Sequence, residues 1–162
     1  MGEVLVAPRH RVERRAMGWW ALRTAAATAV VGGAVGVGYL LITPWRAVLG
    51  PVLLVVLGAG LLHLVVAPPW RYAVHRWEVT GEAVYVRSGW FVREWRIAPL
   101  SRVQTVDTVR GPVQQALGLA TVTVTTASAA GPIALVGLDH RTAEVVAREL
   151  AEITGATPGD AT

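Results

Sequence analysis

Two long apolar runs dominate the first half of the chain, Thr24 to Ile42 and Val48 to Ala67, and only the segment Thr43 to Ala47 separates them. Each run is about 20 residues long, the length at which an α-helix crosses a hydrocarbon core of roughly 30 Å. Because the connection is short, the two helices must be antiparallel. The pattern predicts a transmembrane helical hairpin, with spans at about 22–42 and 48–67, whose two flanks lie on the same side of the membrane.

Arginine residues are distributed unevenly around this hairpin. The turn between the spans holds only Arg46, whereas the flanks hold Arg9, Arg11, Arg14, Arg15, Arg23, Arg71 and Arg76. An excess of positive charge on short flanks marks the cytoplasmic side, so we predict that both termini are cytoplasmic. A cleaved signal peptide also begins with a basic region, but this apolar run is long for such a signal and a second span follows at once.

Aromatic and glycine residues fit the same hairpin. Amphipathic rings settle at headgroup depth, and the predicted interface anchors are Trp19, Trp20, Trp45, Trp70 and Tyr72. Gly32 and Gly36 form a small-xxx-small pair, which predicts close helix packing. A glycine-rich phosphate loop would need a preceding strand, and here the surroundings are continuously apolar. The sequence leaves open whether Arg23 and His63 do more than snorkel towards the interface.

Beyond the hairpin, the sequence is no longer continuously apolar, and apolar residues alternate with polar ones. In the first stretch Trp77 and Val79 share one face, as in a half-buried strand. Turns at Gly81-Glu82 and Ser88-Gly89 are expected to join the first three stretches into an antiparallel meander. The predicted strands are Tyr72–Thr80, Ala83–Ser88, Trp90–Ala98, Arg102–Val109, Thr121–Ser128 and Pro132–Val136, with a turn or short helix between Gly111 and Leu119.

The period then lengthens to that of an α-helix. Asp139 is a good N-cap, Gly155 is expected to close the helix, and the apolar stripe consists of Ala143, Val146, Leu150 and Ile153. This stripe is expected to share one core with Trp77, Val79, Leu119, Val122 and Val124.

The predicted fold class is α+β, a transmembrane hairpin followed by an antiparallel β-barrel or sandwich capped by the C-terminal helix. The predicted organisation is a basic segment at 1–17, the hairpin at 18–68, one domain at 69–155 and a flexible tail at 156–162.

The composition narrows the function classes. The chain has no Cys, and all 15 of its Lys and Arg residues are Arg. Without cysteine, disulfide scaffolds, thiolate zinc sites and thiol nucleophiles are excluded. A pI of about 10.6 could indicate a nucleic-acid partner. Much of the positive charge flanks the predicted spans, however, and membrane topology accounts for it, so we predict no nucleic-acid partner. Hydroxyl and histidine side chains lack the spacing of a nucleophile, dyad or metal site, so we predict no enzyme, cofactor or metal.

Four segments, in order, carry a resemblance to a known family. They are WEVTGEAVYVRSG from Trp77, IAPLSRVQTV from Ile97, GPVQQALGLATV from Gly111, and Gly137-Leu138 before the last helix. With the preceding hairpin they resemble the bacterial pleckstrin-homology (PH) domain of the YdbS-like, membrane-flanked family. The resemblance implies a bent antiparallel barrel capped by a helix at the inner face of a bacterial plasma membrane. It also implies a related membrane protein with several such domains as a partner.

Two function classes remain. The first is a membrane-anchored, non-enzymatic scaffold that assembles with itself or with a related multi-PH-domain membrane protein, and the resemblance favours it. The second is a reader of anionic lipid headgroups, for which the candidate residues are Arg71, Arg76, Arg87, Arg93 and Arg96. Each arginine near an anionic leaflet contributes about 1 kcal/mol. Salt bridges to Glu78 and Glu94 would instead make the same arginines an ordinary solvated sheet face.

Overall fold

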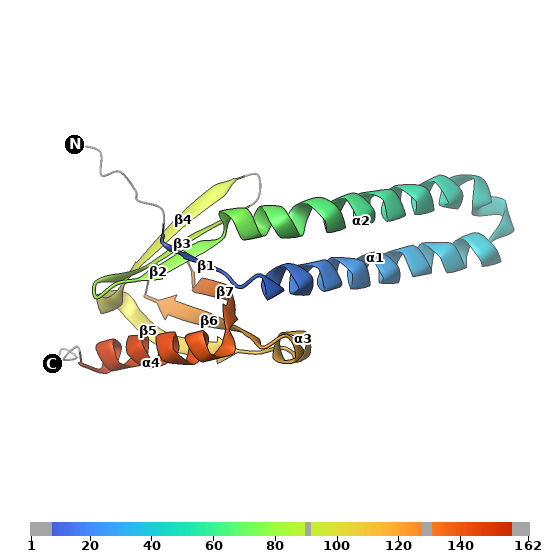
Figure 1. Cartoon of the computed structure of the whole chain (residues 1–162). Coiled ribbons are helices and arrows are strands. Elements are labelled where there is room, and N and C mark those ends of the chain that lie inside the picture. Colours follow the sequence, from blue (N-terminus) through green and yellow to red (C-terminus); the bar gives the residue numbers. More distant parts are fainter. Residues whose placement is uncertain (1–7, 90–91, 128–130, 157–162) are drawn as a thin grey trace.

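The computed structural model describes residues 8–89, 92–127 and 131–156, so the predictions made for Trp90, for Ser128 and for the tail from residue 157 lie outside it. Two long antiparallel helices extend from one end of a two-sheet β-sandwich (Figure 1). The elements are β1 (His10–Arg11), α1 (Arg15–Leu41), α2 (Arg46–Val74), β2 (Arg76–Val79), β3 (Ala83–Gly89), β4 (Arg93–Pro99), β5 (Val103–Val109), α3 (Pro112–Ala116), β6 (Leu119–Thr126), β7 (Ile133–Asp139) and α4 (His140–Ala156). This architecture confirms the predicted fold class.

The helices α1 and α2 form the predicted hairpin, and each is longer than its predicted span. Both are apolar and long enough to cross a membrane, and only 6% and 0% of their most apolar windows are buried within the chain. Apart from the contact of the two helices with each other, most of their apolar surface therefore has no protein partner in the described part of the chain. Arg46 ends α1 by donating hydrogen bonds to the carbonyls of Tyr39 and Leu40, both at 3.0 Å. These carbonyls belong to the last turn, where no helical N–H reaches them.

The first sheet has the strand order β1-β2-β3-β4, and each neighbouring pair is antiparallel. This order confirms the predicted meander of β2, β3 and β4. The predicted turn at Ser88-Gly89 is wrong, because both residues continue β3 and pair with Glu94 and Arg93. Gly89 has a φ of +116°, a backbone conformation that glycine adopts without the steric cost of a Cβ.

The end of α2 also differs from the prediction, since Tyr72 to Val74 are helical rather than extended. The helix continues through Pro68 and Pro69, which lack the N–H groups that would complete its backbone hydrogen bonds. Packing compensates for this loss, because Pro68 and Val74 are buried and Tyr72 packs against the sandwich core. Only after His75, whose N–H bonds to the Arg71 carbonyl at 2.8 Å, does the chain enter β2.

The second sheet has the strand order β5-β6-β7 and is antiparallel, and α4 packs against all three strands. β6 begins at Leu119 and ends at Thr126, so it is shifted towards the N-terminus relative to the predicted strand, whereas β7 ends at Asp139 and is longer than predicted. The predicted N-cap is confirmed, because the Asp139 carboxylate accepts a hydrogen bond from the Arg141 N–H at 3.0 Å. The helix runs through Gly155 to Ala156, so Gly155 does not end it.

The core lies between the two sheets and α4. The predicted core residues that are buried are Trp77, Leu119, Val122, Val124, Ala143, Val146 and Leu150, and Val79 and Ile153 pack against them partly buried. The predicted amphipathic docking of α4 is therefore confirmed. Its exposed face carries charged residues, as an amphipathic surface helix requires.

The segment before the hairpin belongs to the same core, which the sequence did not predict. Strand β1 pairs with β2, and Val12, Ala16 and Trp20 are only 3%, 0% and 5% exposed. All three are members of the core cluster that the two sheets form. The described part of the basic segment, residues 8–17, thus folds with the domain assigned to 69–155, although the hairpin separates them in the sequence.

Polar contacts fasten the start of α1 to the end of β7. The Arg15 guanidinium lies 2.7 Å from the Asp139 carboxylate and donates to the Leu117 carbonyl at 3.1 Å. Burial raises the pKa of Asp139, but hydrogen bonds from Arg141 and Arg15 and the charges of His140 and Arg15 lower it more, so the net pKa is below its usual value. Gly137 makes the close approach possible, because its φ is +77° and a Cβ there would lie 2.8 Å from that of Ala16.

Candidate functional site at the junction of hairpin and sandwich

Three arginines lie side by side on the outer face of the first sheet. The register places Arg11 opposite Arg76, Arg76 opposite Arg87, and Arg87 opposite Trp95. We call Arg11, Arg76 and Arg87 the arginine ladder. Like charges directly opposite one another on a sheet are destabilising. The ladder therefore costs stability unless another charged group compensates it.

The environment of the ladder does not neutralise it. In the described part of the chain, Arg11 has no ion pair with a carboxylate within 4.0 Å, and neither do the candidates Arg71, Arg76, Arg87 and Arg93. The Arg87 guanidinium lies 5.5 Å from the centroid of Trp95, and its buried Nε has no hydrogen-bond partner. The salt-bridged alternative from the sequence therefore does not hold for these four arginines. Glu78 pairs instead with Arg9, at 3.6 Å.

Arg96 differs from the other candidates. It pairs with the buried Val86, so alternation turns its side chain to the face opposite Arg87. Its guanidinium donates to the Pro132 carbonyl at 2.9 Å and lies 3.9 Å from Glu94. These contacts give Arg96 a role in joining β4 to the start of β7, and the structure does not bring it together with the other four.

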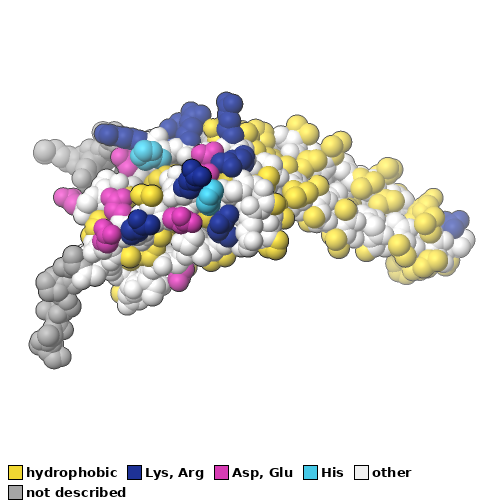
Figure 2. Space-filling view, turned by 60° about the horizontal axis from the view of Figure 1, so that its bottom comes forward, with side chains coloured by type: hydrophobic (Ala, Val, Ile, Leu, Met, Phe, Trp, Pro, Cys, Tyr) yellow, Lys and Arg dark blue, Asp and Glu magenta, His cyan; other side chains and the backbone are white. Residues whose placement is uncertain are grey.

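The four remaining candidates gather at the end of the sandwich from which the hairpin leaves. Arg71 is in the last turn of α2, Arg76 begins β2, Arg87 is near the end of β3, and Arg93 begins β4. Figure 2 shows arginine side chains on the sandwich beside the hydrophobic surface of the hairpin. A helix that crosses a bilayer carries its last turn to the headgroup region. The site thus lies where anionic headgroups would be.

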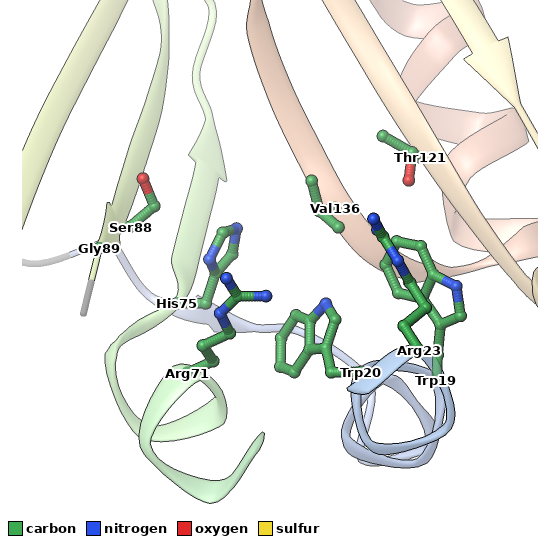
Figure 3. A pocket seen from close by; sticks show the side chains of 9 residues that line it. All are labelled: Trp19, Trp20, Arg23, Arg71, His75, Ser88, Gly89, Thr121 and Val136. Atoms are coloured by element: carbon green, nitrogen blue, oxygen red, sulfur yellow. The ribbon is translucent and has the colours of Figure 1, made fainter. Parts of the chain in front are cut away.

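A cavity of about 400 Å³ opens at the same junction. We call it the junction cavity. Figure 3 shows side chains from both helices and both sheets around it, namely Trp19, Trp20, Arg23, Arg71, His75, Ser88, Gly89, Thr121 and Val136. Arg23 lies over the Trp19 ring at 5.5 Å and Arg71 over the Trp20 ring at 5.9 Å. The described lining of the junction cavity contains two guanidinium groups, those of Arg23 and Arg71, and no carboxylate.

His75 adds a neutral polar group to this cavity. Burial and, as the smaller cause, the charge of Arg71 together lower the pKa of His75 to about 4. The imidazole is therefore uncharged at neutral pH. Its ring centroid lies 6.1 Å from that of Trp20, and its buried Nε2 has no hydrogen-bond partner.

The predicted interface anchors separate into two groups. Trp45 and Trp70 are 60% and 47% exposed, as an anchor at headgroup depth requires. Trp20 is instead a core residue, and Trp19 and Tyr72 pack partly buried against that core. Sequence analysis could not separate the two groups, because an aromatic residue beside a membrane span has the same pattern in either role.

The glycines of the hairpin have different surroundings. A Cβ at Gly32 would lie 3.1 Å from a Leu57 methyl group, whereas a Cβ at Gly36 would meet no atom within 4 Å. Among the glycines of the hairpin, Gly60 has the least room for a side chain, because Thr28 occupies the space where its Cβ would lie. His63 lines a groove between the helices near this contact. Within the described residues, no group of three or more His, Cys, Asp or Glu could hold a metal ion.

The comparisons with known proteins agree with this architecture. The family model described as "Bacterial PH domain" matches residues 22–154, which is most of the chain. The chain is also 38% identical over 69 residues to the UPF0699 transmembrane protein YdbS of Bacillus subtilis (strain 168), an alignment that covers 43% of this chain and 43% of that protein. The alignment thus spans less than half of the relative's length. No solved structure matches the chain significantly. With its two apolar helices and its two sheets capped by a helix, the chain belongs to the bacterial PH-domain family as a membrane-associated, YdbS-like member.

Proposed function

We propose that this protein is a membrane-anchored, non-enzymatic binding module whose arginines hold the sandwich against the anionic headgroups of a bacterial plasma membrane, with both termini in the cytoplasm. The observation that carries the proposal is the set Arg71, Arg76, Arg87 and Arg93, which has no carboxylate partner among the described residues and lies beside the hairpin. The alternative role for these arginines, an ordinary solvated sheet face, involved salt bridges to Glu78 and Glu94. Those glutamates pair with Arg9 and Arg96 instead.

Such binding needs little affinity. Each arginine near the leaflet contributes about 1 kcal/mol, and the hairpin already keeps the sandwich at a high effective concentration beside the headgroups. The arginines would therefore orient the sandwich against the leaflet, and would not be needed to recruit it to the membrane. Exposed charges are screened over about 8 Å at physiological ionic strength. The contact should therefore weaken as salt rises and should show little preference among acidic headgroups.

The first prediction concerns the distance between the sandwich and the membrane. Because the chain has no cysteine, Ala151→Cys, at an exposed position of α4, offers a unique site for a donor dye. In nanodiscs with acceptor-labelled lipid, we expect higher energy transfer with phosphatidylglycerol than with phosphatidylcholine alone. Arg87→Gln combined with Arg93→Gln should remove most of this difference, and so should high salt.

The matched control removes the same charge elsewhere. Arg102 and Arg148 are both exposed. Arg93 begins β4, whereas Arg102 comes just after the other end of that strand, and Arg148 lies in the middle of α4. Arg102→Gln with Arg148→Gln should leave the lipid dependence unchanged. If both double variants behave alike, or if acidic lipid has no effect on wild type, the arginines do not orient the sandwich.

Self-association, or assembly with a related membrane protein, is a second candidate, and one observation favours it. Gly33 and Gly36 on α1 have open space where a Cβ would lie, so no residue of α2 fills these two positions. Small residues on a lipid-facing helix surface allow a further helix to approach closely.

This second candidate makes its own prediction. Gly36→Leu should weaken association between chains in nanodiscs, because a leucine side chain at this position keeps a second helix from approaching the backbone closely. Two-colour single-molecule colocalisation would measure it. Gly58→Leu is the control, since Gly58 also has open space around its Cβ position but lies on α2. Wild type that stays monomeric at all densities would exclude self-association through this face.

A further inference from the structure

We propose that the junction cavity binds the phosphate group of one anionic glycerophospholipid from the adjoining leaflet, with Arg23 and Arg71 as its cationic partners. This inference rests on the proposed function only in that the sandwich must face an anionic leaflet. The arginines tested above lie on the outer sheet face, whereas Arg23 and Arg71 lie in helices on opposite sides of the cavity.

The polar groups of the cavity suit a phosphate. Figure 3 shows Trp20 between Arg71 and Arg23, with His75 next to Arg71. Guanidinium groups donate paired hydrogen bonds to phosphate oxygens in a planar fork. Each of the two lies over an indole ring, at 5.5 Å for Arg23 and 5.9 Å for Arg71, and such stacking restrains the side chain while leaving its N–H edge available.

Nothing in the described lining already neutralises this charge. The cavity has no Asp or Glu, and neither guanidinium has an ion pair with a described carboxylate. His75 contributes no negative charge and presents an Nε2 that is buried without a hydrogen-bond partner. Two cations in a partly enclosed space attract an anion more strongly than the same cations in water do.

The surroundings favour a lipid over a free anion. Both arginines belong to the long apolar helices, Arg23 about two turns into α1 and Arg71 in the last turn of α2. The rest of the wall includes the rings of Trp19 and Trp20 and the side chain of Val136. A volume of about 400 Å³ accommodates a headgroup and not a whole lipid. The acyl chains would then lie along the exposed apolar surface of the hairpin, which has no protein partner in the described chain.

Native mass spectrometry of the full-length protein, released from phosphatidylglycerol-containing nanodiscs and washed in mild detergent, tests this inference. We expect wild type to retain one phosphatidylglycerol molecule per chain. Arg23→Gln with Arg71→Gln should reduce this retained fraction at least about tenfold, because two charge-assisted contacts are lost. Arg23→Lys with Arg71→Lys keeps the charge and should retain an intermediate fraction.

Two further arms separate the possible outcomes. Arg87→Gln with Arg93→Gln should retain the lipid, so loss of orientation and loss of the bound lipid can be told apart. Millimolar inorganic phosphate should not displace the lipid, and displacement would assign the cavity to a free anion. Equal lipid retention in wild type and in Arg23→Gln with Arg71→Gln would overturn the inference. Loss of the lipid from both the glutamine and the lysine variants would also overturn it, if hydrogen exchange shows that the sandwich is folded in both.

Discussion

Replacing Trp20 by alanine is expected to lower the free energy of unfolding of the sandwich by about 3–5 kcal/mol, the usual cost of removing a buried aromatic side chain. Trp20 is only 5% exposed although it lies at the start of a membrane-spanning helix. Its ring packs with the core cluster, and it supports Arg71 and His75. Hydrogen exchange of the strand amides in the full-length protein, in mild detergent, would measure the change.

Trp45→Ala is the matched control, because Trp45 lies in the turn of the hairpin and is 60% exposed. This change should cost less than about 0.5 kcal/mol. If Trp20→Ala costs no more than Trp45→Ala, then Trp20 acts as an interface anchor and the start of α1 does not contribute to the sandwich.

Replacing Leu150 by alanine is the second change with a large expected effect, about 2–5 kcal/mol. Leu150 is fully buried in the stripe of α4 that faces the sheets. Removing its branched end leaves a cavity in a close-packed core, and the cost depends on how far α4 can settle into it. The same hydrogen-exchange measurement should show faster opening of α4 and of β5, the strand with which α4 has its main contact.

The neighbouring Glu149 provides the control, since its side chain is exposed on the same helix turn. Glu149→Ala should cost less than about 0.5 kcal/mol, because alanine is also a good helix former and no buried contact is lost. Similar costs for the two substitutions would show that α4 does not dock through its apolar stripe.

Local patterns were sufficient for the hairpin, for most strands and for α4. Length and continuous apolarity predict a membrane-spanning helix without knowledge of its neighbours. The alternation in β3 and β6 and the helical period after Asp139 are likewise local signals. The sequence also held information that the prediction did not use. Arg93 and Arg96 are three residues apart, so they point to opposite faces of any regular strand.

Other features depend on contacts between distant segments. Strand β1 consists of His10 and Arg11 alone, too short for any periodicity, and it exists because it pairs with β2. The burial of Val12, Ala16 and Trp20 follows from that pairing and from the fit of Ala16 against Gly137. In the sequence these residues stand among arginines and predict only a basic membrane flank.

The candidate site likewise has features that local sequence predicts and features that depend on contacts between distant segments. The sequence by itself determined that a hairpin anchors one small antiparallel domain and that unusually many arginines flank it, because chain length, hydrophobicity and charge are local quantities. Only the tertiary structure decided which arginines act together. Strand register aligned Arg11, Arg76 and Arg87, and the meeting of two helices with two sheets created the junction cavity between Arg23 and Arg71. Register and cavities arise from packing between segments far apart in the chain, and no local pattern records them.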